Sequence, residues 1–429
     1  MSLITSMYSG TSGLSTNSQG LSVTGDNIAN VNTVGFKEGR ANFQDMLAET
    51  VHGGSGLSQI GRGSMLGDVQ QIFSQGALIN TGSVTDLAIT GHGFFVVNGT
   101  VNGVSGDFYT RAGQFTVDSE GYLVNPNDLK IQGYGVDDAG QIAGGVGDIQ
   151  LPTSPLPANP TTLVEMSINL DSREAVTTWD PTDPVNSSNF STSATVYDTL
   201  GNSHRVDIYF SKTADNTWDY HAMVDGGELA GGTPGVLQEI DTGTLTFGTD
   251  GSMTSSTSTP TAITFADGAG SQTIGMDFGV GTALGGTGFD GATQFADESA
   301  VVTLSQDGYS TGNLQDISID SDGEITGLFS NGEHRLLGQV ALASFQNENG
   351  LQRAGNSLWL STDDSGDPAV GAANTGGRGS ISSNSLEQSN VDLAKEFVNM
   401  IAYQRGFQAN SRTVTTASDM LNEVVNIKR

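Results

Sequence analysis

The chain has 429 residues, including 59 glycines and no cysteine, and its formal net charge is −31. The absence of cysteine excludes disulfides, thiolate metal sites, cysteine nucleophiles and cysteine-derived crosslinks. Nucleic acid is an unsuitable partner, because no basic patch is present to neutralise phosphates. The length predicts two or three domains, while abundant glycine with few charged and aromatic residues favours turn-rich antiparallel β structure.

The charge is unevenly distributed along the chain. Residues 1–62 and 386–429 hold 8 basic and 9 acidic side chains, whereas residues 63–385 hold the other 8 basic and 38 acidic ones. Nearly neutral ends with an acidic middle indicate ends that are buried in contacts and a middle that faces water. Solubility alone explains much of the acidic middle.

The N-terminal segment predicts a long helix from about Leu3 to Ile28 or Ala29. Four apolar residues recur at a spacing of seven, which is typical of a helix packed on another helix: Met7, Leu14, Leu21 and Ile28. The helix is expected to end in the segment 27–37, whose asparagines and glycine supply left-handed backbone positions. This end of the chain lacks the basic and apolar regions of a Sec signal peptide, and no segment is apolar enough for membrane insertion.

The middle of the chain predicts two β-rich domains, one inserted into the other. The pattern Asp-x-x-Gly-x-apolar begins at Asp118, Asp137 and Asp320 and predicts a hairpin turn at each position. Two copies precede residue 150 and the third follows residue 315, so we expect one β domain interrupted by an insertion. Four prolines between 152 and 160 predict a stiff linker into that insertion.

The C-terminal segment predicts a second long helix of at least 36 residues. Its apolar residues recur at the same spacing of seven: Leu386, Leu393, Met400, Phe407, Val414 and Leu421. Helices at both ends of a β-rich chain favour a stalk that joins copies of the protein, and these ten apolar residues are the predicted assembly interface. The alternative is that both helices belong to the core of an ordinary globular domain.

The predicted fold class is therefore mainly β with α-helical termini. The chain is discontinuous and multidomain, with a coiled-coil-like terminal helix pair and two β-rich domains nested by insertion. The predicted parts are a terminal helical tube domain (1–30 plus 384–429), an extended connector (31–75 plus 371–383), an inner β domain (76–150 plus 307–370) and an inserted outer β domain (161–305).

No motif predicts an enzyme, a metal site or a cofactor. Gly286–Gly291 matches the dinucleotide-binding fingerprint in its letters but lacks the strand before it and the helix after it. Asp320 and Asp322 suggest a calcium loop, but Ser318 and Phe329 stand where acidic ligands would be needed. The five histidines show no metal-ligand spacing. A carboxylate pair for glycoside hydrolysis stays open, although nothing singles one out among the 47 acidic residues.

Two segments resemble a known family, the bacterial flagellar rod, hook and hook-associated axial proteins. Residues 27–37 are similar to the family's N-terminal signature, and residues 386–410 to its C-terminal signature. Within the family, the length, the insertion and the segments 306–312 and 330–340 resemble the hook proteins. The resemblance covers residues 1–150 and 305–429 and leaves the insertion unmatched.

The resemblance implies a subunit that self-assembles into the curved, hollow hook between rod and filament, which acts as a universal joint. It implies export through the flagellar type III pathway without a cleaved signal peptide and an extracellular location in the flagellum. The implied partners are further copies of the chain, the distal rod protein, the hook–filament junction protein, the hook cap and the export apparatus. In the family signature, five residues would shape the turn out of the first helix: Asn27, Asn30, Asn32, Gly35 and Phe36.

Two other functions stay open. A distal rod or other axial protein has the same two ends, although rod proteins are shorter and lack the insertion. A secreted β-rich glycan-binding protein or glycosidase would explain the acidic interior rich in Ser, Thr and Gly, but not the spacing of seven at both ends.

Overall fold

The computed structural model describes residues 3–47, 49–53, 56–137 and 140–427. Residues 1–2 and 428–429 of the predicted helical ends, and residues 138–139 of the second predicted hairpin turn, lie outside the described residues. The chain forms two compact units, and it is mainly β with helical ends, which confirms the predicted fold class. Unit 1 comprises Met1–Thr153, Ile317–Gly327 and Arg335–Arg429, and unit 2 comprises Ser154–Asp316 and Leu328–His334.

Unit 2 is thus inserted into unit 1 in the sequence, and its bounds are wider than the predicted 161–305. The segment that enters the insertion and the segment that leaves it both belong to unit 2. They pair with each other through isolated bridges between Leu156 and Gly312 and between Asn159 and Tyr309. The division into four parts stays a prediction.

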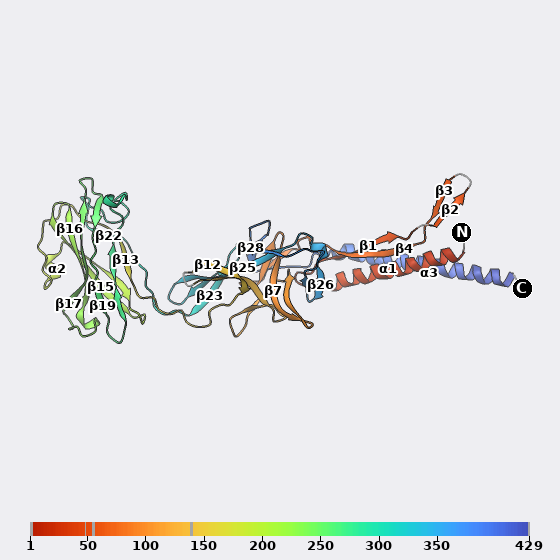
Figure 1. Ribbon diagram of the computed structural model, residues 1–429, viewed down its shortest axis with the longest axis horizontal. Helices are drawn as coiled ribbons and strands as arrows, with labels where there is room; N and C mark the ends of the chain where they lie inside the picture. The colour runs from red at the N-terminus through yellow and green to blue at the C-terminus, as the bar shows by residue number, and fades with distance from the viewer. Residues whose placement is uncertain (1–2, 48, 54–55, 138–139, 428–429) are drawn as a thin grey trace. The chain divides into compact units, whose positions relative to one another are not determined.

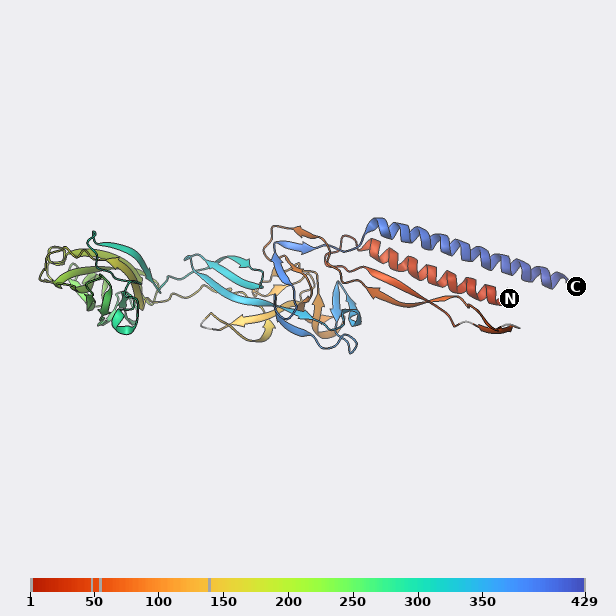
Figure 2. The same cartoon turned by 90° about the horizontal axis from the view of Figure 1, so that it is seen from above.

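The two long helices of unit 1 are α1 (Leu3–Ala29) and α3 (Leu393–Ile427), which lie side by side (Figures 1 and 2). The bounds of α1 confirm the predicted first helix. The C-terminal helix was predicted to include Leu386, and this is wrong: Leu386 lies in strand β30 (Ser385–Glu387), where it pairs with Ile79 of strand β5 (Leu78–Asn80). The helix begins later because the Asp392 carboxylate caps it, accepting the backbone N–H groups of Ala394 at 2.8 Å and Lys395 at 3.2 Å.

A two-stranded ribbon runs along α1 (Figure 2). It consists of β1 (Gly39–Asp45) and β4 (Ser64–Gln71), which are antiparallel, and is called the ribbon below. The hairpin β2 (Glu49–Gly53) and β3 (Gly56–Ile60) lies between them in the sequence.

The β part of unit 1 is built around a twelve-stranded sheet. Phe94, Tyr109 and Trp359 are buried at its centre, and Phe73 and Phe345 pack edge-on against them. The sheet contains β7 (Phe94–Val101), β8 (Val104–Thr110), β9 (Thr116–Val117), β10 (Leu123–Val124), β11 (Lys130–Val136), β12 (Ile142–Asp148), β23 (Leu314–Ile319), β24 (Glu324–Phe329), β25 (His334–Ser344), β26 (Gln352–Gly355), β27 (Leu358–Leu360) and β28 (Ala369–Ala372). Two further pairs are β5 with β30 and β6 (Leu87–Thr90) with β29 (Ser380–Ser383), and η3 (Glu348–Gly350) is a single 3₁₀ turn.

The predicted Asp-x-x-Gly turns connect antiparallel neighbours in this sheet. Asp118 joins β9 to β10, and Asp320 joins β23 to β24. In each turn the aspartate accepts backbone N–H groups two and four residues ahead, and the glycine takes a left-handed conformation, with φ of +89° at Gly121 and +80° at Gly323. Strands β11 and β12, on either side of Asp137 and Gly140, are antiparallel, while the turn between them includes residues outside the described part of the chain. The hairpin predictions at Asp118 and Asp320 are confirmed.

Unit 2 consists of two sheets that share one core. Its five-stranded sheet contains β14 (Phe190–Tyr197), β15 (Ser203–Ala214), β16 (Thr217–Asp225), β17 (Leu237–Phe247) and β18 (Met253–Ser256), and its three-stranded sheet contains β21 (Gly275–Asp277), β13 (Leu163–Asn169) and β22 (Ala300–Gln306). Trp218, Phe210 and Phe278 are buried between them. The remaining elements are the pair β19 (Ala262–Thr264) and β20 (Ser271–Thr273), the short helix α2 (Pro184–Ser187), and the turns η1 (Gly226–Glu228) and η2 (Thr282–Leu284).

Candidate assembly interface

The contact between α1 and α3 is made by small residues of α1. A Cβ atom added at Gly10 would lie 2.8 Å from Val414, and one added at Gly20 would lie 2.9 Å from the Tyr403 ring. Such distances leave no room for a side chain, so these positions let the two helix backbones approach closely. The small-residue seam of α1 consists of Gly10, Gly13, Asn17 and Gly20.

The seam pairs asparagine with glycine in both directions. Gly13 lies against the Asn410 side chain, while Asn17 lies against Gly406 of α3. Position numbers in α1 rise as those in α3 fall, so the helices are antiparallel. An asparagine knob on each helix meets a glycine gap on the other, which fixes the register of the pair.

The apolar residues predicted in α1 border this seam. Each of the four is half-buried: Met7, Leu14, Leu21 and Ile28. The buried positions of α1 are instead Gly10, Thr16, Gly20, Thr24 and Asn27. The spacing of apolar residues does not mark the seam. Its small and polar residues do follow the alternating spacing of three and four that marks a helix face: Gly10, Gly13, Asn17, Gly20, Thr24 and Asn27.

The five predicted residues that do lie in α3 fall on two parts of its surface. Val414 faces Gly10 of the seam, and Met400 and Leu421 are half-buried. Leu393 and Phe407 are exposed, together with Phe397 and Ile401, all between 40% and 50%. At about 100° per residue these four side chains lie on one flank of the helix, beside the face that meets α1. We call Leu393, Phe397, Ile401 and Phe407 the outer strip. Their part in assembly stays a prediction.

The family-signature residues surround the turn that leaves α1. Asn27 is 1% exposed and joins three elements: its amide nitrogen donates to Gly39 at 2.8 Å and to Glu396 of α3 at 3.0 Å, and its oxygen accepts the Gly39 N–H at 2.9 Å. The Asn30 side chain donates to the Asp26 backbone oxygen at 2.8 Å.

The other three family-signature residues differ in their burial. Gly35 has φ of +68° and lies so close to Ala112 that a Cβ atom would stand 2.5 Å from its backbone nitrogen. Phe36 is buried, with the Arg353 guanidinium 5.3 Å from its ring centre. Asn32 is exposed.

A buried ion network ties the two ends of the chain together next to this turn. The Lys37 ammonium lies 2.6 Å from the Glu387 carboxylate, which also lies 3.5 Å from the Arg111 guanidinium. The three side chains are at most 1% exposed. Burial lowers the pKa of Lys37 and of Arg111, and the neighbouring Glu387 opposes this shift in both. No local sequence signal marks the network, because its members are far apart in the chain.

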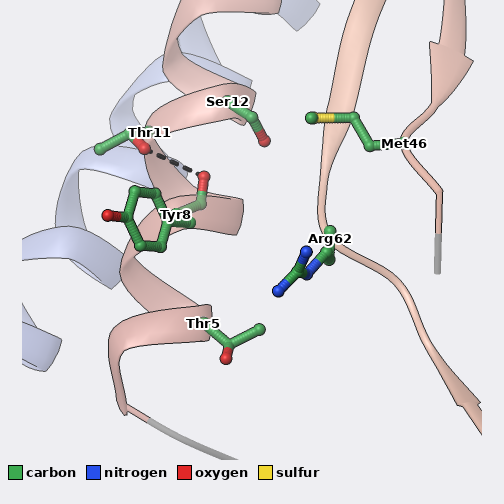
Figure 3. Close-up of a pocket in the computed structure, with 6 residues that line it drawn as sticks. All are labelled: Thr5, Tyr8, Thr11, Ser12, Met46 and Arg62. Atoms are coloured by element: carbon green, nitrogen blue, oxygen red, sulfur yellow. Dashed lines mark hydrogen bonds between the residues drawn. The ribbon is translucent and has the colours of Figure 1, made fainter. Parts of the chain in front are cut away.

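A cleft, called the α1–ribbon cleft below, lies between α1 and the two segments that continue the ribbon strands, after β1 and before β4 (Figure 3). Its volume is about 590 Å³, and it is lined by Thr5, Tyr8, Thr11, Ser12, Met46 and Arg62. No group of three or more His, Asp or Glu side chains in the described part of the chain is arranged to hold a metal ion. Among the described helices, none is both long and apolar enough to cross a membrane.

Four family models match the chain. They are the flagella basal body rod protein (residues 7–37), the flagellar hook protein FlgE/F/G D1 domain (88–172), the flagellar basal body protein FlaE D2 domain (169–309) and the flagellar basal body rod FlgEFG protein C-terminal region (382–427). The D2 model covers most of the predicted insertion 161–305, for which the sequence alone suggested no relative, and extends four residues past its end.

Curated relatives match over the full chain. The flagellar hook protein FlgE of Borreliella burgdorferi is 36% identical, covering 99% of this chain and 100% of its own length. FlgE of Escherichia coli is 35% identical over 97% of this chain and 98% of its own length, and FlgE of Brucella suis is 31% identical over 100% of both. The crystal structure of Helicobacter pylori flagellar hook protein FlgE2 has a similar fold, with a TM-score of 0.53 and 16% identity, covering 72% of this chain and 100% of that one.

Proposed function

Since the chain belongs to the flagellar hook protein family and is a structural subunit of the hook, we propose that its copies join through the helical ends of unit 1. The observation that carries this proposal is the outer strip of α3. Large apolar side chains exposed along one flank of a helix gain free energy when a partner covers them. The seam side of α3 is already occupied by α1, so the strip is available for contact with another copy.

The charge distribution supports the same contact. Residues 1–62 and 386–429 are nearly neutral, whereas the rest of the chain is strongly acidic. In a polymer of identical copies, like charges repel wherever acidic surfaces meet. The nearly neutral ends are therefore the part of the chain that copies can bring together at the lowest electrostatic cost.

Several finer features belong to the proposal and rest on family membership. The proposed partners are further copies, the distal rod protein, the hook–filament junction protein, the hook cap and the flagellar export apparatus. We place the assembled protein outside the cell, reached through the type III export pathway, and assign it no catalytic role. The four predicted parts would form the tube, connector, inner β domain and outer β domain.

Electron microscopy of the purified full-length chain tests the proposal. We expect hollow, curved tubes above a critical protein concentration, and a lower critical concentration when added salt screens the acidic units. A chain that stays monomeric at every concentration and salt level would contradict assembly through the ends. Monomers that bind a glycan would favour the carbohydrate-binding alternative.

A further inference from the structure

The cleft between α1 and the ribbon has the form of a receptor for a helix. Met46, which follows β1, and Arg62, which precedes β4, point towards α1, where the small side chains of Thr5 and Ser12 lie on the facing side (Figure 3). Met46 is 39% exposed, so it keeps apolar surface in contact with water at the cleft, whereas the Tyr8 ring points away from Met46 and Arg62 (Figure 3). A volume of about 590 Å³ is within the range in which protein sites bury a ligand or several side chains.

The outer strip of α3 has the complementary form. Phe397 and Ile401 are four positions apart and therefore neighbours on the helix surface, where they form an apolar ridge. Ridges of one helix pack into grooves on another surface in this way. The strip and the cleft belong to different elements of unit 1, and Figure 2 shows α1 between α3 and the ribbon.

The charge of the two surfaces favours a second copy of the chain as the occupant. α1 contains one charged residue, Asp26, among its 27 residues, and one of the six residues that line the cleft is charged, Arg62. The cores of protein interfaces are depleted of charge in the same way. Unit 2 is strongly acidic, with Arg173, Arg205 and Lys212 as its Lys and Arg residues. Two copies of unit 2 would repel each other.

We propose that the outer strip of α3 in one copy seats in the α1–ribbon cleft of the next copy. The inference rests on the proposed function and specifies which surfaces meet. Because the two surfaces differ, the contact is heterologous: each copy that fills a neighbour's cleft leaves its own cleft open for another. Such contacts generate rings or open helical polymers, whereas a self-complementary patch would stop at a dimer.

The lack of cysteine in the chain allows a direct cross-linking test. Ile401→Cys and Met46→Cys are made as separate single-cysteine variants, mixed, assembled into tubes and treated with a short bismaleimide. We expect a covalent dimer whose cross-linked peptides contain positions 46 and 401. Mixtures with Ala402→Cys or Asp45→Cys are the matched controls. Ala402 lies one position from Ile401 and about 100° around the helix, and Asp45, the last residue of β1, lies one position before Met46.

The outcomes separate the pairing from assembly itself. A cross-link from the 46–401 mixture that is missing from both controls is the expected result. Tubes that give no 46–401 product, or give as much product with the controls or with Ile401→Cys alone, would overturn the pairing and leave assembly through the ends intact. Failure of the unsubstituted chain to form tubes would overturn the proposed function and the pairing with it.

Discussion

Glu387 neutralises two buried cations, so the joint between the chain ends depends on a single carboxylate. Lys37 also donates to the Ser74 backbone oxygen at 2.9 Å, and Gly76 N–H donates to Glu387 at 2.8 Å. The network therefore connects the segment after α1, the segment after the ribbon and strand β30. Such buried charges are stable only as a set, because each would be costly to leave unpaired.

Glu387→Gln is expected to destabilise unit 1 strongly. Removing one partner of a buried ion pair costs about 3–5 kcal/mol, since the remaining charges lose their compensation. Urea denaturation should show an earlier transition for unit 1 and an unchanged one for unit 2. Asp26→Asn is the control: its pair with Arg353 is nearly half exposed on both sides, and loss of such a pair costs about 1 kcal/mol or less. Equal effects of the two substitutions would contradict the role of the network.

The loss of unfolding free energy caused by Glu387→Gln should also depend on pH. The folded-state pKa of Lys37 is lowered by burial, so the folded chain binds fewer protons than the unfolded chain between that value and the unfolded pKa of about 10.4. Stability from this group therefore rises with pH across that window. Without Glu387 the Lys37 pKa falls further, and the ammonium is neutralised more easily.

We therefore expect the deficit of Glu387→Gln relative to the unsubstituted chain to shrink between pH 7 and about pH 10. Urea midpoints of both proteins at the two pH values measure this. Adding Lys37→Met to the variant should remove the effect. A deficit that is constant with pH would show that Lys37 does not titrate in the folded variant.

Phe407→Ala is expected to block assembly while leaving both units folded. Phe407 is 44% exposed, so its truncation costs the free chain less than the roughly 3–5 kcal/mol lost at a fully buried Phe. The remaining loss falls on a contact that every subunit repeats, and each 1.4 kcal/mol raises the critical concentration about tenfold. Sedimentation of tubes over a concentration series measures it.

Val398→Ala is the matched control for this experiment. Val398 is 66% exposed and lies nine positions from Phe407, which at about 100° per residue places it on the opposite side of α3. Its truncation should change the critical concentration much less. If Phe407→Ala assembled at the same critical concentration as the unsubstituted chain, Phe407 would not be part of the interface.

At the scale of elements, the glycines of α1 have two different roles. Gly20 lies against the Tyr403 ring, whereas a Cβ atom at Gly25 would meet nothing within 4 Å. Alanine at Gly25 should therefore stabilise the helix by about 0.5–1 kcal/mol through propensity alone. Alanine at Gly20 gains the same propensity but crowds the seam, which costs about 1–3 kcal/mol.

We expect Gly20→Ala to lower the melting temperature of the helices and Gly25→Ala to raise it. Thermal unfolding followed by far-ultraviolet circular dichroism measures both, and the two variants control for each other because they share one helix. A stabilising Gly20→Ala would mean that the seam has space to spare.

The sequence predicted some of these elements and missed others for identifiable reasons. The first helix ends where predicted because Asn27 and Gly35 mark its end in the local sequence. The second helix was extended to Leu386 because the spacing of seven continues across a strand, while the Asp392 cap was overlooked. The ion network of Lys37, Arg111 and Glu387 is purely tertiary and leaves no local pattern. The cleft likewise depends on how the ribbon folds back on α1.

At the scale of the whole molecule, the paired linkers determine how separable unit 2 is. The bridges Leu156–Gly312 and Asn159–Tyr309 hold the entering and leaving segments side by side. Unit 2 also has its own core, centred on residues such as Trp218 and Phe278. A domain with its own core and adjacent ends can be removed without opening the core of its host.

Deleting 161–305 and joining Pro160 to Gln306 should therefore leave a soluble chain with a folded unit 1. The new junction closes the Asn159–Tyr309 bridge with a short turn, and the remaining chain keeps a net negative charge. We expect it to form tubes that are straighter or mechanically weaker, because contacts made by unit 2 are lost. Circular dichroism, electron microscopy and bending stiffness in an optical trap measure these properties. The control is the full chain with Pro157→Gly and Pro160→Gly, which loosens the linker but keeps unit 2. Aggregation of the deletion variant without a folded β domain would show that unit 2 completes the core of unit 1.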